Sequence, residues 1–196
     1  AIVVGEDFHF GQGRSGNVDA LRGIGEEWDF EVHALELIRH SDEAREPVSS
    51  TAIRRALAGG DVARAASMLG RPYEVRGVVG QGDQRGRVIG FPTVNIPVPK
   101  VMAWPADAVY AGWCTLDDGG RHRAAINIGR RPTFYEHAEQ SLLEAHLIDF
   151  EGDLYGHELS VEFVDFLRSE RKFEGLEQLQ EQLKHDIEEA RAVLDR

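Results

Sequence analysis

A glycine-rich stretch at residues 80–95, GQGDQRGRVIGFPTVN, carries the first residues that could bind a substrate. Glycines allow the backbone to approach a ligand closely, and loop N–H groups and arginines can hold phosphate oxygens. The candidates for such contacts are Gly82, Arg85, Gly86, Arg87 and Gly90. The stretch lacks the Gly-Lys-Ser/Thr ending of a P-loop. It could therefore bind a phosphate or simply connect two strands.

Thr93 and Asn95 close this stretch and lie two residues apart on a predicted strand. Residues at this spacing point to the same face of a sheet. A hydroxyl and an amide carbonyl are hard oxygen donors that suit Mg²⁺, which takes its other ligands from water and substrate phosphates. The pair could thus hold a metal and a nucleotide, or it could form the polar outer face of a strand.

Glu144 interrupts a mostly apolar segment, SLLEAHLI at residues 141–148. Carboxylates are seldom buried unless they are paired or functional, and a general base for a hydroxyl nucleophile fits this position. An ion pair on an edge strand is the alternative. His146 lies on the same predicted face, but the pattern assigns it no role.

Three further polar residues, Ser50, Thr51 and Arg54, open a predicted helix after Pro47. The first turn of a helix with hydroxyls and an arginine can bind an anion. Helix capping explains the hydroxyls equally well.

The elements that would position these residues change in character along the chain. Residues 1–37 indicate part of an α/β unit, with strands at residues 1–4 and 30–35 and a short helix from Asn17 to Arg22. Two helices follow between Pro47 and Gly70, and we place a domain boundary after residue 70.

Beyond residue 70 the pattern has period two, with glycine-rich turns and without intervening helices. This predicts an antiparallel barrel or sandwich. The candidate strands are Tyr73–Val79, Thr93–Ile96, Tyr110–Leu116, His122–Ile128, Leu142–Phe150 and Glu158–Phe166. A final helix has an apolar stripe that includes Leu179, Leu183 and Ile187. We expect it to cover the barrel, and a dimer-forming helix is the alternative.

Composition bounds the partners of this chain of 196 residues, which has a net charge of −12. A diffuse acidic surface argues against nucleic acid and anionic membranes, so small molecules are the expected partners. No apolar run is long enough to cross a bilayer. The one cysteine, Cys114, is predicted to be a core residue, and its isolation fits a reducing cytoplasm. We expect a cytoplasmic monomer or weak homo-oligomer.

Taken together, five segments in this order resemble the prokaryotic bifunctional riboflavin kinase/FAD synthetase family. They are Gly90–Asn95, Val109–Trp113, Asn127–Phe134, Glu144–Phe150 and Phe166–Phe173. Val94 stands where the family usually has alanine, which leaves its two polar neighbours in place. The resemblance covers essentially the whole chain.

For residues 71–196, the resemblance implies a riboflavin kinase domain. Its expected fold is mainly β, a six-stranded antiparallel Greek-key barrel with a long C-terminal helix. Thr93 and Asn95 would hold Mg²⁺ and the phosphates of ATP, beneath the loop from Gly80 to Gly90. Glu144 would take the proton from the 5′-hydroxyl of riboflavin, and FMN would be the product. The expected flavin contacts are Phe166, Leu167, Arg171 and Phe173.

Residues 1–70 resemble the later part of the family's FMN adenylyltransferase module, a partial α/β nucleotidyltransferase segment. Ser50, Thr51 and Arg54 match one of its motifs, whereas its early histidine pair is absent from this sequence. The chain also begins within a strand pattern and without Met. We therefore expect it to make FMN but no FAD, and a longer natural protein to make both.

Two other functions are consistent with the sequence. A non-catalytic flavin- or nucleotide-binding module would bind flavin without consuming ATP. An interaction protein would use the stripe of the last helix to dock a partner.

Overall fold

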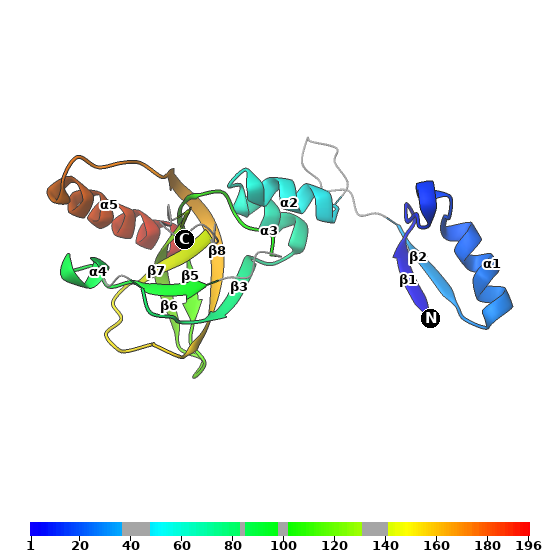
Figure 1. Ribbon diagram of the computed structural model, residues 1–196, viewed down its shortest axis with the longest axis horizontal. Helices are drawn as coiled ribbons and strands as arrows, with labels where there is room; N and C mark the ends of the chain where they lie inside the picture. The colour runs from blue at the N-terminus through cyan, green and yellow to red at the C-terminus, as the bar shows by residue number, and fades with distance from the viewer. Residues whose placement is uncertain (37–47, 83–84, 98–101, 131–140) are drawn as a thin grey trace, which may run out of the picture. The chain divides into compact units, whose positions relative to one another are not determined.

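The computed structural model describes residues 1–36, 48–82, 85–97, 102–130 and 141–196. The chain forms two compact units, residues 1–49 and residues 50–196 (Figure 1). Each unit is described by itself.

The first unit contains two parallel strands joined through a helix. Strand β1 (Ile2–Gly5) pairs with β2 (Val32–Leu35), and between them lie a short 3₁₀ turn, η1 (Gln12–Arg14), and α1 (Val18–Trp28). The side chain of Asn17 accepts a hydrogen bond from the Ala20 amide and caps α1. The helix runs past the expected end at Arg22 because its C-terminal cap is Asp29, which takes the left-handed conformation with φ 55°.

The second unit is built on a six-stranded antiparallel sheet, as predicted. Its strands are β3 (Tyr73–Val78), β4 (Val94–Pro97), β5 (Ala108–Thr115), β6 (Arg121–Arg130), β7 (Ser141–Leu147) and β8 (Glu158–Ser169). Their order in the sheet is β3-β8-β5-β6-β7-β4. Three consecutive strands, β5 to β7, lie side by side, and β8 returns beside β5, which is a Greek key. The amide of Gly80 bonds the carbonyl of Asn95 at 2.8 Å, so the two ends of the order meet and nearly close the barrel.

Apolar side chains from every strand fill the barrel. Ile96, Ile126, Leu143 and Phe163 are fully buried there. Cys114 lies in the same core, and burial raises the pKa of its thiol to about 12. The thiol is therefore protonated and unreactive at neutral pH, as expected for a core cysteine.

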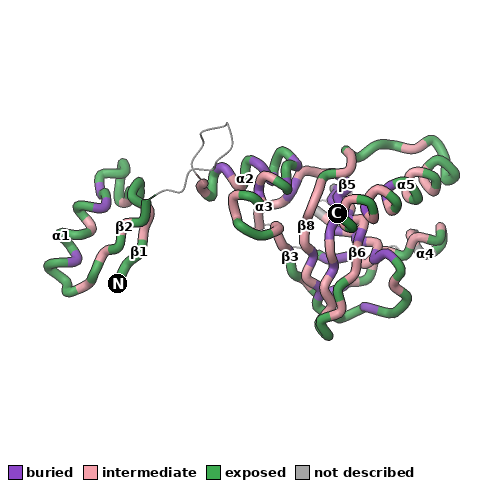
Figure 2. Tube along the Cα trace, turned by 180° about the vertical axis from the view of Figure 1, so that it is seen from behind, coloured by how far each residue is buried: buried purple, intermediate pink, exposed green. Residues whose placement is uncertain are grey.

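Helices α2 (Ser50–Ala58) and α3 (Val62–Leu69) belong to the second unit and pack on the barrel. Leu57, Val62 and Ala65 are fully buried in the same cluster as the barrel interior, which Figure 2 shows as buried stretches of both helices. The compact units therefore part at residues 49/50, whereas the sequence placed a boundary at 70/71.

The last helix, α5 (Leu176–Leu194), lies over β5, β6 and β8. Ile187, Ala190 and Val193 pack with Ala111 and Ile148 on the outside of the barrel, as predicted. A short helix that the sequence did not indicate, α4 (Arg85–Val88), lies within the glycine-rich stretch. In the described residues, no helix is long and apolar enough to span a membrane.

Candidate active site

A cavity of about 570 Å³ lies between the barrel, the glycine-rich stretch, the segment after β8 and α5. Its lining combines apolar side chains, among them Ile89, Phe91 and Leu183, with carboxylates and cations. Thr93 and Glu144, which lie 51 positions apart in the sequence, both line it. The cavity therefore brings together two of the residues that the sequence singled out.

A row of polar residues crosses three neighbouring strands at this cavity. Asn95 of β4 pairs in register with Glu144 of β7, and Glu144 pairs with Asn127 of β6. Residues directly opposite each other share a face of the sheet. The next pair along, Ile96 and Leu143, is fully buried in the barrel interior, so the polar row lies on the outer face. Thr93 precedes β4 by one residue, where the sequence had placed it on the strand.

Asn95 is enclosed although it is polar. It is 7% exposed, and its side-chain oxygen has no hydrogen-bond partner among the described residues. Its amide lies so close to Gly82 that a Cβ at Gly82 would collide with it. A buried oxygen without a partner destabilises a fold by roughly 1–3 kcal/mol. A cation or a water molecule at this oxygen would remove that cost, so the residues present can accommodate a metal ion.

A second carboxylate, Glu170, approaches the same row from the segment after β8. It accepts a hydrogen bond from Asn127, and its carboxylate lies against Gly129, where a Cβ would collide with it. Burial, then the charges of Asp107 and Glu144, raise the pKa of Glu170 above its usual value. Sequence reasoning missed Asn127 and Glu170. A polar residue in the apolar run of β6 could have indicated the first, but Glu170 stands in a charged stretch that resembles any exposed turn.

The glycines of the predicted nucleotide loop take part in close packing. Gly86 lines the cavity, and a Cβ there would collide with the Phe91 carbonyl and approach Thr93. Gly90 has φ +86°, which favours glycine. The side chains of Arg85 and Arg87 lie outside the described residues.

The four predicted flavin contacts divide into two pairs. Arg171 and Phe173 line the cavity, and the Arg171 guanidinium lies 4.8 Å from the centre of the Phe173 ring. Phe166 instead packs edge-on against Tyr110, with ring centres 5.7 Å apart, beside the turn at Gly60. Leu167 packs beneath α5. Neither of these two lines the cavity.

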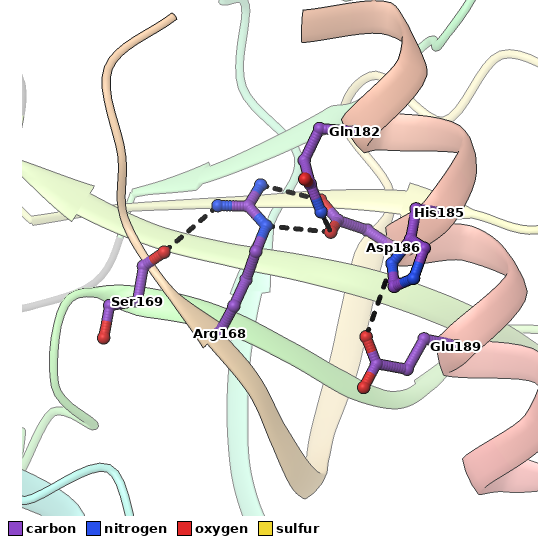
Figure 3. Close-up of polar contacts among 6 residues, drawn as sticks. All are labelled: Arg168, Ser169, Gln182, His185, Asp186 and Glu189. Carbon is purple, nitrogen blue, oxygen red and sulfur yellow. Dashed lines mark hydrogen bonds and ion pairs between the residues drawn. The ribbon is translucent and has the colours of Figure 1, made fainter. Parts of the chain in front are cut away.

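A buried ion pair joins β8 to α5 at the cavity wall (Figure 3). Nε and Nη2 of Arg168 donate to the two oxygens of Asp186 at 2.8 and 2.7 Å. Gln182 donates to the same carboxylate at 2.7 Å, and Asp186 is 1% exposed. This bidentate contact fixes the helix that carries Leu179, Leu183 and Ile187. Those three residues of the apolar stripe line the cavity.

A second cavity, of about 360 Å³, lies beside the first. Its lining includes Pro92, Ala145, Phe150 and Tyr155. Thr93 lines both cavities. The residue before β4 therefore stands between two adjacent binding spaces.

The remaining predicted residues, Ser50, Thr51 and Arg54, are exposed on α2 and line neither cavity. Among the described residues there is no group of three or more His, Cys, Asp or Glu side chains suited to a metal ion.

Comparison with known proteins identifies the family. Residues 69–194 match the sequence pattern of the riboflavin kinase family. The chain belongs to this family. Residues 1–52 match the FAD synthetase family.

Relatives from two bacteria carry the description bifunctional riboflavin kinase/FMN adenylyltransferase. The Bacillus subtilis protein is 37% identical over 96% of this chain and 58% of its own length. The Haemophilus influenzae protein is 39% identical over 99% of this chain and 61% of its own length. The chain thus spans about three fifths of the length of these relatives.

Two solved structures are similar to the chain. A Streptococcus pneumoniae protein described as a macrolide-efflux protein has a TM-score of 0.80 and 33% identity, and the match covers 95% of this chain and 58% of that one. Riboflavin kinase from Trypanosoma brucei has a TM-score of 0.50 and 25% identity, with 64% and 81% of the two chains covered.

Proposed function

We propose that the chain transfers the γ-phosphate of ATP to the 5′-hydroxyl of riboflavin, which yields FMN and ADP. The observation that carries this proposal is the pairing of Glu144 with Asn95 at a cavity that Thr93 also lines. A base beside a phosphate-binding turn is the arrangement that transfer to an alcohol needs. Membership of the riboflavin kinase family selects the alcohol.

The two cavities suit the two substrates. We assign the flavin to the larger one, because Phe91 and Phe173 offer aromatic surface and Arg171 offers a cation. The smaller one, lined by Val79, Phe150 and Tyr155, would take the nucleotide base. Thr93 lies at the boundary, where the γ-phosphate and the ribityl chain must meet. Phosphoryl transfer depends mainly on such positioning and on charge neutralisation.

Thr93 and Asn95 would hold Mg²⁺, and the ion would neutralise charge on the phosphates. The orphaned oxygen of Asn95 supports this assignment. Backbone groups around Gly82, Gly86 and Gly90 would contact the phosphates. The same role for Arg85 and Arg87 stays a prediction.

In the proposed reaction Glu144 accepts the proton of the riboflavin 5′-hydroxyl. The hydroxyl oxygen bonds to the γ-phosphorus as the bond to the β,γ-bridging oxygen breaks, and ADP leaves. Such general-base assistance contributes about 10²- to 10⁴-fold to a rate. Arg171 and Phe173 would orient the flavin. Flavin contacts of Phe166 and Leu167, which pack against Tyr110 and beneath α5, stay predictions.

The match of residues 1–52 to the FAD synthetase family extends the proposal to a longer protein that also adenylylates FMN. A cytoplasmic location and a monomeric or weakly associated state stay predictions from the sequence.

Incubation of the chain with riboflavin, ATP and Mg²⁺, followed by chromatography of the flavins and nucleotides, tests the proposal. We expect FMN and ADP in equal amounts and no FAD. Retention of riboflavin by the protein without any ADP would contradict catalysis and support a binding module.

A further inference from the structure

The segment Ile89–Thr93 forms a wall shared by the two cavities. Ile89, Phe91 and Thr93 line the larger one, and Pro92 and Thr93 line the smaller one. Any movement of this wall would shift Thr93 relative to Glu144. The contacts that hold the wall therefore matter to the geometry of the reaction.

Two side chains from different elements hold the carbonyls of this wall. Nδ1 of His146, on β7, lies 2.7 Å from the Pro92 carbonyl oxygen. Nε2 of Gln180, on α5, donates to the Ile89 carbonyl at 3.1 Å. The imidazole also meets the Phe91 ring edge-on, with ring centres 6.1 Å apart. The wall is thus tied to the barrel on one side and to the helix on the other.

The chemistry of the His146 contact fixes its direction. A carbonyl oxygen only accepts, so Nδ1 carries the proton and donates it. Pro92 has no amide of its own to anchor the turn, and its carbonyl is the last one before Thr93. His146 follows Glu144 by two residues on the same strand, so the two side chains share a face. One strand thereby carries both the proposed base and the anchor of the proposed phosphate-binding turn.

We propose that His146 is a positioning residue for phosphoryl transfer, which holds Thr93 at a fixed distance from Glu144 through the Pro92 carbonyl, and that Gln180 assists from α5. This inference rests on the proposed kinase function. Neither residue transfers a proton or touches the reacting atoms in this account.

The test compares two substitutions of His146. His146→Leu removes the hydrogen-bond donor. His146→Asn keeps one, because the asparagine side-chain nitrogen is attached to Cγ, as Nδ1 is in histidine. His185→Leu is the matched control, because His185 is exposed on α5, contacts Glu189 and lines neither cavity. Steady-state rates are measured against both substrates. Affinity for MgADP and hydrogen exchange of the Phe91 amide, which donates to the Gly86 carbonyl, are measured on the same proteins without turnover.

We expect His146→Leu to lower kcat/KM for ATP roughly ten- to a hundredfold, because small misplacements of reacting groups have effects of this size. The Phe91 amide, which donates to the Gly86 carbonyl, should exchange faster. Because His146 also lines the larger cavity, riboflavin affinity should fall as well. His146→Asn should recover most of the catalytic rate and most of the protection of the amide from exchange. His185→Leu should match the wild type.

Equal behaviour of His146→Leu and His185→Leu would overturn the inference. So would a folded His146→Asn protein that recovers neither rate nor exchange protection. If His146→Leu does not fold, Gln180→Leu decides by the same measurements, and unchanged exchange of the Phe91 amide would refute the positioning role. If the wild type makes no FMN, the kinase proposal fails, while MgADP binding and amide exchange still test the anchor.

Discussion

The two compact units differ in how completely each buries its own apolar surface. In the first unit Val3, Trp28 and Leu35 are 59%, 72% and 57% exposed, on two strands and one helix. In the second unit the strands nearly close into a barrel and their inward side chains are fully buried. An isolated pair of strands is marginally stable, whereas a closed sheet leaves few edges unpaired. Within the described residues, residues 50–196 therefore bury their apolar side chains more completely than residues 1–49 do.

The largest expected effect is on folding, and it is tested by two truncated proteins, one with α2 and α3 and one without them. Residues 50–196 should fold and make FMN at a rate within about twofold of the whole chain. Residues 71–196 lack Leu57 and Val62, and each buried aliphatic side chain contributes about 1.5–3 kcal/mol. We expect this shorter piece to unfold or to aggregate.

Circular dichroism and thermal melting of both truncations check this expectation. A stable, active protein of residues 71–196 would contradict this expectation and show that the barrel folds without α2 and α3.

The next effect concerns the ion pair that fixes α5. Asp186→Asn leaves the Arg168 guanidinium facing a neutral group, and loss of one partner of a buried pair costs about 3–5 kcal/mol. Urea unfolding measures the loss. Glu189→Gln on the same helix is the control and should change the unfolding free energy little, because its contact with His185 is at the surface. Equal stability of the two variants would show that the helix is held by its apolar contacts alone.

Features of the fold and the site could be predicted from the sequence where they depend on residues close together in the chain. The alternation of apolar residues indicated all six strands, and a carboxylate within an otherwise apolar strand pattern indicated Glu144, which is half-buried in the structure. The positions of Phe166 and Leu167 were not predictable, because the β5–β8 pairing contains register shifts between Val109 and Tyr110 and between Ala111 and Gly112. Such bulges change which side chains face a site, and the sequence carries no signal of them.

Other features depended on contacts between distant segments. Glu170 approaches Asn127 only because the segment after β8 returns to the end of β6. The packing of α2 and α3 on the barrel likewise depends on tertiary contacts. From the sequence alone, both helices were grouped with residues 1–49. Propensity and spacing cannot distinguish these outcomes.

A smaller effect is expected at the proposed phosphate-binding turn. Thr93→Ala should weaken MgADP binding about tenfold, in line with the loss of a hydrogen bond to a charged group. Calorimetric titration measures the dissociation constant. Trp28→Ala, an exposed position in the first unit, is the control and should leave it unchanged. If both substitutions weakened binding equally, the site would not belong to the barrel unit alone.

The smallest expected effect is a pH dependence of the free energy of unfolding, which arises from an ion pair at the surface of the second unit. Two hydrogen bonds of 2.6 Å from Arg191 lower the pKa of Asp149 below its usual value. The folded pKa is therefore below the unfolded value of about 3.9. The contact stabilises the fold above that pH, and the contribution is lost as the pH falls through the folded pKa.

Asp149→Asn should accordingly be slightly less stable than the wild type at pH 7, with a difference that shrinks toward pH 2. Unfolding curves at several pH values measure it. A difference that stayed constant over this range would assign the effect to packing and not to charge.

The most direct test of the account is a comparison of wild type and Glu144→Gln by FMN formation and by MgADP binding on the same preparations. The substitution keeps the shape of the side chain but removes its ability to accept a proton. We predict that FMN formation falls by about 10²- to 10⁴-fold while the MgADP dissociation constant changes less than about twofold. Full activity, or an equal loss of binding and turnover, would contradict the assignment of Glu144 as the base.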